Sequence, residues 1–200
     1  MRTSLTRLLT TTLLFGVLAC VPSLLFAQGN GGGGPPPVEK NMPPVVTPDF
    51  CWATGGIHVS GDEASLALSD DLDFVLRRRP KEVQSRTEFE VMGISPTADP
   101  TSFAVTLEGA VIARSPVVQT IELFDYDAAV WVLVDTWDAT RFFDSTVTVT
   151  VPNNLLPAPD LGRFVARKTH SVEARIRYQS VVARQSFASS TDQFVWTIGQ

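Results

Sequence analysis

The stretch SVEARIRY, residues 171–178, alternates polar and apolar side chains at every position. The apolar positions are Val172, Ala174, Ile176 and Tyr178, and the charged positions between them are Glu173, Arg175 and Arg177. A period of two is the pattern of a β-strand with one buried face and one face in water. The stretch therefore predicts a strand that places its apolar side chains in a core.

The same alternation recurs along the chain. Clear strands are predicted at residues 103–109, 145–151 and 193–199, and weaker ones at residues 57–59, 74–76, 87–94, 116–124 and 129–136. The core-facing positions of the clear strands are Phe103, Val105, Leu107, Val147, Val149, Val151, Phe194, Trp196 and Ile198. No long segment keeps a helical period, although residues 61–72 have room for one short helical turn.

Segments rich in Gly, Pro, Asn and Asp separate the apolar runs, as between neighbouring strands of a sheet. Roughly eight to ten short strands with frequent turns are typical of a sandwich. We therefore predict an all-β fold, a two-sheet antiparallel β-sandwich of jelly-roll or immunoglobulin-like type. The predicted domain covers residues 49–200, which is long enough to bury a two-layer core.

The N-terminus has the features of an export signal. Arg2 and Arg7 precede an apolar segment that ends at the small residue Ala27, so residues 1–27 are predicted to be a cleaved signal peptide. Pro22 interrupts the apolar run, which argues against a retained membrane span and predicts no transmembrane segment in the mature chain. A lipoprotein modified at Cys20 is the alternative. The predicted location is extracellular, periplasmic or on the cell surface.

Residues 28–48 are rich in glycine and proline and are predicted to be a disordered linker without packed contacts. Beyond the signal peptide the chain has one cysteine, Cys51, so no disulfide can form within it. Phe50 and Trp52 flank this cysteine, and we expect it to be a buried small apolar residue.

Residues 121–137, IELFDYDAAVWVLVDTW, place an acidic group between two predicted strands. The first interpretation is a solvated hairpin turn in which Asp125 and Asp127 bond their own backbone. The second is a calcium site that uses the same two carboxylates, although calcium takes more oxygen ligands than two. The strand after the turn is apolar on both faces, and we expect Trp131 to anchor the core.

A candidate ligand-binding group lies around the same hairpin. Trp137 follows the apolar alternation and stands close in sequence to Arg141, so we expect an exposed ring with a charged neighbour. Together with Tyr126 these residues are the predicted ligand-binding side chains. Two charged runs, SDDLDF at residues 69–74 and RRRPK at residues 77–81, are interpreted as a solvated turn and a solvated edge. For RRRPK, a grip on phosphate or a carboxylate polymer is the alternative.

Six stretches in a fixed order resemble a module of exported proteins from environmental bacteria. They are SDDLDFVLRR (69–78), SPTADPTSFAVTLEG (95–109), QTIELFDYDAAVWVLVDT (119–136), DSTVTVTV (144–151), VEARIRY (172–178) and TDQFVWTI (191–198). This resemblance covers most of residues 50–200. It implies a galactose-binding-like or jelly-roll-like sandwich, often C-terminal and of unassigned function, and it implies no catalytic residues.

The charge balance, 16 basic against 21 acidic residues, argues against a protein that grips nucleic acid by its phosphates. None of the common catalytic motifs is present, so we predict a protein that is not an enzyme and has no cofactor, with calcium as the alternative. The leading hypothesis is binding or assembly at the cell surface, with carbohydrate or cell-envelope components as partners. The alternative is a carbohydrate-binding or calcium-assisted adhesion module, and a secreted hydrolase is the third hypothesis.

Overall fold

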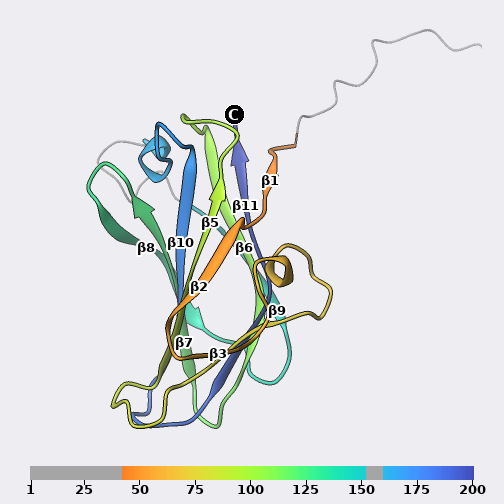
Figure 1. Ribbon diagram of the computed structural model, residues 1–200, viewed down its shortest axis with the longest axis vertical. Helices are drawn as coiled ribbons and strands as arrows, with labels where there is room; N and C mark the ends of the chain where they lie inside the picture. Colours follow the sequence, from red (N-terminus) through yellow and green to blue (C-terminus); the bar gives the residue numbers. More distant parts are fainter. Residues whose placement is uncertain (1–41, 152–159) are drawn as a thin grey trace, which may run out of the picture. The chain divides into compact units, whose positions relative to one another are not determined.

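The computed structural model describes residues 42–151 and 160–200 (Figure 1). These residues contain eleven strands and two short 3-10 helices. The strands are β1 (Val45–Val46), β2 (Phe50–Gly55), β3 (Ile57–Ser60), β4 (Phe74–Arg77), β5 (Arg86–Ile94), β6 (Ser102–Ile112), β7 (Val117–Asp125), β8 (Val130–Asp138), β9 (Ser145–Thr150), β10 (Ser171–Ser180) and β11 (Ala188–Gly199). The helices are η1 (Ala64–Leu66), which confirms the expected helical turn, and η2 (Leu161–Phe164). The predicted signal peptide lies outside the described residues.

The strands form two antiparallel sheets, which confirms the predicted sandwich. One sheet has the order β3-β4-β11-β6-β9, with β1 also paired to β11, and the other has the order β2-β5-β10-β7-β8. The pairs β4 with β11, β5 with β10, β6 with β9 and β7 with β8 are nested one inside the next. Such nesting is a long hairpin rolled into two layers, which is the jelly-roll topology rather than the immunoglobulin one.

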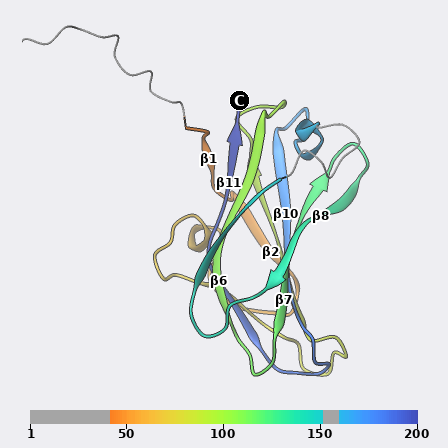
Figure 2. The same ribbon diagram turned by 180° about the vertical axis from the view of Figure 1, so that it is seen from behind.

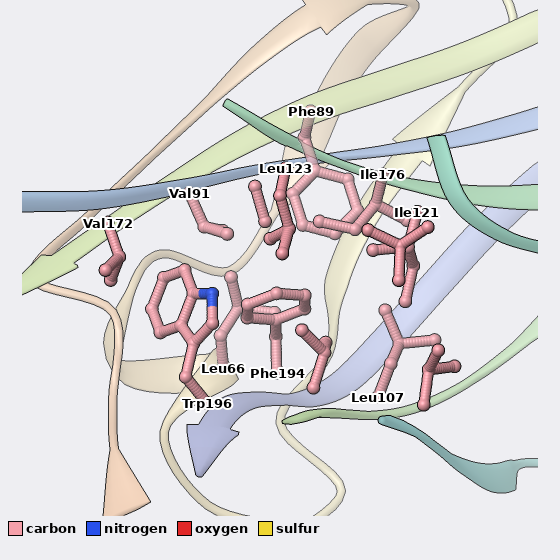
Figure 3. Close-up of a cluster of buried hydrophobic side chains, with 14 of the residues drawn as sticks. Leu66, Phe89, Val91, Leu107, Ile121, Leu123, Val172, Ile176, Phe194 and Trp196 are labelled. Carbon is pink, nitrogen blue, oxygen red and sulfur yellow. The ribbon is translucent and has the colours of Figure 1, made fainter. Parts of the chain in front are cut away.

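The core lies between the sheets and is made by the predicted alternating positions. In β10 the side chains of Val172, Ala174, Ile176 and Tyr178 are buried, as predicted. Figure 3 shows the two inner faces meeting, with Val91 and Leu123 from one sheet opposite Trp196 and Phe194 from the other. Leu66 of η1 joins the same cluster. Each sheet thus leaves its other face toward solvent, because side chains of a strand alternate between the two faces.

The sandwich begins earlier in the chain than predicted. Val45 and Val46 form β1 and pair with Thr197 and Trp196 of β11. Val46 is buried in the core, because its apolar side chain covers the part of β11 that β4 does not reach. The expectation that residues 28–48 make no packed contacts is therefore wrong at β1, and residues 28–41 lie outside the described residues.

A β-bulge in β8 exchanges the expected environments of two tryptophans. The register of β8 against β7 shifts between Leu133, which pairs with Glu122, and Asp135, which pairs with Ile121. An extra residue in one strand moves every later side chain to the opposite face. Trp131 therefore lies on the solvent-facing side, whereas Trp137 packs against the core. The predictions that Trp131 anchors the core and that Trp137 is an exposed ring are both wrong for this reason.

Cys51 lies in β2 with its side chain half-buried against the core. Burial, reinforced by the negative charges of Glu63 and Asp62, raises the pKa of the Cys51 thiol to about 12. Only the thiolate is a strong nucleophile. The structure therefore favours the expected structural role.

We expect native Cys51 to react slowly with a maleimide reagent, even at a pH where an ordinary thiol of pKa about 8.5 becomes reactive. Peptide mass spectrometry measures the rate and separates Cys51 from Cys20. The unfolded protein is the control and should label at the rate of a free thiol. Equal labelling rates in native and unfolded protein would contradict a protected thiol.

Candidate functional site

The solvent-facing side of the sheet β2-β5-β10-β7-β8, here called the outer face, has polar side chains in its middle and apolar ones at its edges. The strand register aligns one row directly across all five strands, and this row is Trp52, Glu90, Arg175, Glu122 and Leu133. Neighbouring strands are about 4.8 Å apart, so the row spans roughly 19 Å. The row is long enough to contact an extended ligand at several points.

Ion pairs fix the middle of the outer face. Arg175 bonds Glu90 at 2.8 Å and approaches Glu122 at 3.5 Å. Arg177, two residues further along β10, bonds Glu88 at 2.5 Å and the same Glu122 oxygen at 3.4 Å. Two guanidinium groups and three carboxylates therefore form one connected network. A network holds its polar atoms in place better than isolated surface pairs do.

The network also controls the charge of its most buried member, Glu88. Burial alone would raise the pKa of this carboxyl group. Hydrogen bonds from Arg177 and Thr54, together with the positive charges of Arg177 and Arg175, outweigh burial and lower the pKa of Glu88 below its usual range. Glu88 is therefore ionised at neutral pH and acts as an acceptor in the network.

Aromatic side chains border the network on both edge strands. On β2, Trp52 is 39% exposed and Phe50 is 58% exposed. On β8, Trp131 is half-buried, with the Arg175 guanidinium 4.0 Å from its ring centre. Phe124 of β7 meets the same indole edge to face at 5.2 Å. The Trp131 ring is thus held in one orientation before any ligand binds.

A hollow of about 270 Å³ extends the outer face toward the end of β10. Its lining residues are Val118, Thr120, Arg177, Gln179, Ser180 and Val181. The hydroxyl of Thr120 has no hydrogen-bond partner within the described residues. Arg177 also belongs to the ion-pair network, so the hollow and the network adjoin.

The structure separates the three predicted ligand-binding residues. Tyr126 lies in the β7–β8 turn and donates a hydrogen bond to Glu173 at 2.9 Å. Burial, with the hydrogen bond and charge of Glu173, raises the pKa of the Tyr126 hydroxyl. Trp137 lies at the other end of β8 and faces the core, and Arg141 pairs with Val111 of the opposite sheet. Of the three, only Tyr126 borders the outer face.

The carboxylate of Asp125 supports the turn, as one interpretation predicted. It accepts hydrogen bonds from the backbone of Asp127 at 3.0 Å and of Ala128 at 2.9 Å. The turn is not solvated at this point, however, because Asp125 is 0% exposed and pairs with Arg163 of η2. Figure 2 shows η2 beside the turn that joins β7 to β8.

Arg163 occupies the position beside Asp125 that a cation would take, while Asp127 is exposed. In residues 42–151 and 160–200 no three His, Cys, Asp or Glu side chains are arranged to hold a metal ion. The calcium site at Asp125 and Asp127 therefore stays a prediction from sequence. The geometry adds no further ligand to these two residues.

Sequence reasoning assigned the outer-face charges only to solvent. The alternation of residues 171–178 placed Arg175 and Arg177 outside, but their partners Glu88, Glu90 and Glu122 come from two other strands. Trp52 was named only as a neighbour of Cys51, because no strand was predicted to place it. The available signal was the alternation F-C-W-A in residues 50–53, which puts Phe50 and Trp52 on one face of β2.

No protein-family model matches the chain, and no curated protein matches it. Among solved structures, one similar chain is a family 28 carbohydrate-binding module specific for non-crystalline cellulose. It has 10% identity and a TM-score of 0.43, over 64% of this chain and 74% of that one. A family 61 module in complex with β-1,4-galactotriose has 11% identity and a TM-score of 0.38, over 76% and 87% of the two chains. A family 29 module from Piromyces equi has 11% identity and a TM-score of 0.40, over 76% and 88%.

The ligands in these descriptions belong to those proteins. Within the described residues of this chain, no helix has both the length and the apolar character needed to cross a membrane.

Proposed function

We propose that the outer face binds a carbohydrate chain and that the protein is a binding protein without catalytic activity. The observation that carries this proposal is a fixed polar network with aromatic side chains on both edge strands: Phe50 and Trp52 are exposed on β2, and Trp131 is half-buried on β8. A sugar ring has an apolar face of C–H groups and a rim of hydroxyls. Aromatic rings can pack against the C–H face, and oriented charged groups can hydrogen-bond to the hydroxyls.

The charges of the outer face favour a neutral sugar chain. Glu88, Glu90 and Glu122 outnumber Arg175 and Arg177, so the network has a net negative charge and would repel an acidic sugar. Neutral hydroxyls can donate to the carboxylates and accept from the guanidinium groups. The network needs no rearrangement for this, because its ion pairs already fix the polar atoms.

The same network argues against glycoside hydrolysis on this face. A hydrolase of the usual kind needs one carboxylic acid with a raised pKa beside a second carboxylate. The most buried carboxyl group here, Glu88, has a lowered pKa and is paired to Arg177. Export, which residues 1–27 predict, would bring the outer face into contact with extracellular or envelope polysaccharide.

The test is binding of soluble neutral polysaccharides, namely cellulose derivatives, xylan, mannan and galactan, by affinity electrophoresis and calorimetry. Trp52→Ala is expected to weaken binding about tenfold, because an aromatic contact contributes up to about 1.5 kcal/mol beyond buried area. Trp52 lies exposed on an edge strand, so the variant should fold, and circular dichroism verifies this. Phe143→Ala is the matched control, since Phe143 is exposed but lies outside the outer face.

Failure of all four polysaccharides to bind the wild-type protein would reject the proposal for neutral glycans. Binding that survives both Trp52→Ala and Trp131→Ala would place the sugar elsewhere on the protein. Both results test only the proposed role of the outer face, and neither tests the fold.

A further inference from the structure

A groove of about 480 Å³ lies on the other sheet, at the end where β4 and β6 finish and β11 begins. The residues that matter in its lining are Arg77, Ile112, Arg114, Phe142, Phe187 and Ala188. The register places Arg77 beside Ala188 and Ala188 beside Ile112, so three adjacent strands form its floor. This groove shares no residue with the outer face, and nothing in the proposed function uses it.

Two arginines line the groove, and a third contacts the backbone of one of them. Arg77 ends β4, Arg114 follows β6, and Arg141 donates a long hydrogen bond of 3.4 Å to the backbone oxygen of Arg114. All three are exposed, and among the described residues none forms an ion pair with a carboxylate. The protein as a whole has a net charge of −5, so this is a local concentration of positive charge.

The run RRRPK contributes only one residue to this group. Arg78 donates to the backbone oxygen of Glu82, and Arg79 donates to the backbone oxygen of Gly56 at 2.8 Å. Arg77 takes part in neither contact and lines the groove. The positive groove is thus assembled from β4, the end of β6 and the segment after β8, and it takes only Arg77 from the basic run.

An exposed aromatic ring stands beside the arginines. Phe142 is 68% exposed and has a backbone φ of +72°, a conformation that bulky residues rarely adopt. Backbone hydrogen bonds hold it there, from Val111 to Thr140 at 2.9 Å and from Phe142 to Val111 at 3.0 Å. Unusual backbone conformations of this kind gather at ligand sites. The buried Phe187 and the exposed Ile112 continue the apolar surface from this ring.

Loop contacts also fix the position of Arg114. With its amide oxygen turned toward the β6–β7 loop, Gln185 accepts hydrogen bonds from the backbone of Arg114 at 3.0 Å and of Ser115 at 2.9 Å. The backbone on both sides of the groove is therefore tied down before a ligand arrives, and less conformational freedom is lost on binding.

We infer that this groove binds an acidic polysaccharide whose sugar units carry carboxylates. Guanidinium groups pair with carboxylates through two parallel hydrogen bonds, and Arg77 and Arg114 supply two such groups. The apolar face of the same sugar ring can pack against Phe142, which a bare anion would not need. The protein would then hold a neutral chain on one sheet and an acidic chain on the other.

The experiment titrates the full protein with oligogalacturonate by calorimetry at low and at physiological salt. We expect binding that weakens with salt. Arg77→Gln and Arg114→Gln should each weaken it at least about tenfold, because hydrogen bonds to charged groups are strong. Phe142→Ala should also weaken it. Arg167→Gln is the matched control, since it removes one exposed positive charge near η2, outside the groove, and should leave binding unchanged.

Other results would overturn the inference. Absence of oligogalacturonate binding at low salt would show that the groove is not a binding site. If Arg167→Gln weakened binding as much as Arg77→Gln does, the binding would be non-specific electrostatic attraction. If oligophosphate bound more tightly than oligogalacturonate and Phe142→Ala had no effect, the ligand of the groove would be a bare anion and not a sugar. Loss of oligogalacturonate binding in Trp52→Ala would assign the acidic sugar to the outer face. Neutral glycan binding is measured in parallel, so the two sites fail separately.

Discussion

Arg163→Met is expected to lower the free energy of unfolding by about 3–5 kcal/mol, because it removes one partner of a buried ion pair. The remaining partner, Asp125, is 0% exposed and would keep its charge away from water with two backbone hydrogen bonds but no counter-charge. Denaturant unfolding followed by tryptophan fluorescence measures the change. A change below about 1 kcal/mol, the value typical of surface ion pairs, would show that the pair is not buried in solution.

The matched variant is Asp125→Asn in the Arg163→Met background. Asparagine keeps an oxygen that can accept the hydrogen bonds from Asp127 and Ala128, but it carries no charge. We expect this second change to restore part of the stability that Arg163→Met removes. A double variant less stable than Arg163→Met alone would contradict the proposed cause, since the loss would then come from packing or from the turn.

Trp196→Ala is expected to lower the free energy of unfolding by about 3–5 kcal/mol as well, the range for removing a large buried aromatic side chain. Trp196 is 0% exposed and meets Phe194 edge to face at 4.8 Å. A loss of this size is a large part of the stability of an ordinary domain. The same unfolding measurement applies.

Two tryptophan variants serve as controls for Trp196→Ala. Trp131→Ala should cost clearly less, because Trp131 is half-buried on the outer face. Trp196→Phe should cost less than Trp196→Ala, because phenylalanine fills most of the space. It also removes the indole N–H of Trp196, which has no hydrogen-bond partner within the described residues. If Trp131→Ala were the more damaging change, the two rings would have the opposite roles.

Local alternation was sufficient to predict nine of the eleven strands, all except β1 and β2, and the buried face of the regular ones. Residues 171–178 show this most clearly, because every second side chain is buried as expected. The jelly-roll order of the strands was left open against an immunoglobulin-like order. Alternation reports which face of a strand is buried, and it does not report which strand lies beside it.

The errors come from features that alternation cannot represent. A continuous apolar sequence looks the same with or without a bulge. The bulge between Leu133 and Asp135 nevertheless decides which of Trp131 and Trp137 faces solvent. The candidate sites depend on contacts between distant segments, such as Arg175 with Glu90, which are 85 residues apart. A single sequence shows which residue types are present, but it does not show which distant residues contact one another in the fold.

The position of β11 within its sheet has a consequence for how the protein folds. β11 follows every other strand of the described chain, yet it pairs with β1, β4 and β6. During synthesis, β4 and β6 emerge long before the strand that must join them, and their edges stay unpaired until then. Strand edges of this kind can join other chains. Folding should therefore be slow, in the millisecond-to-second range of folds with distant pairings, and should profit from chaperones that cover these edges.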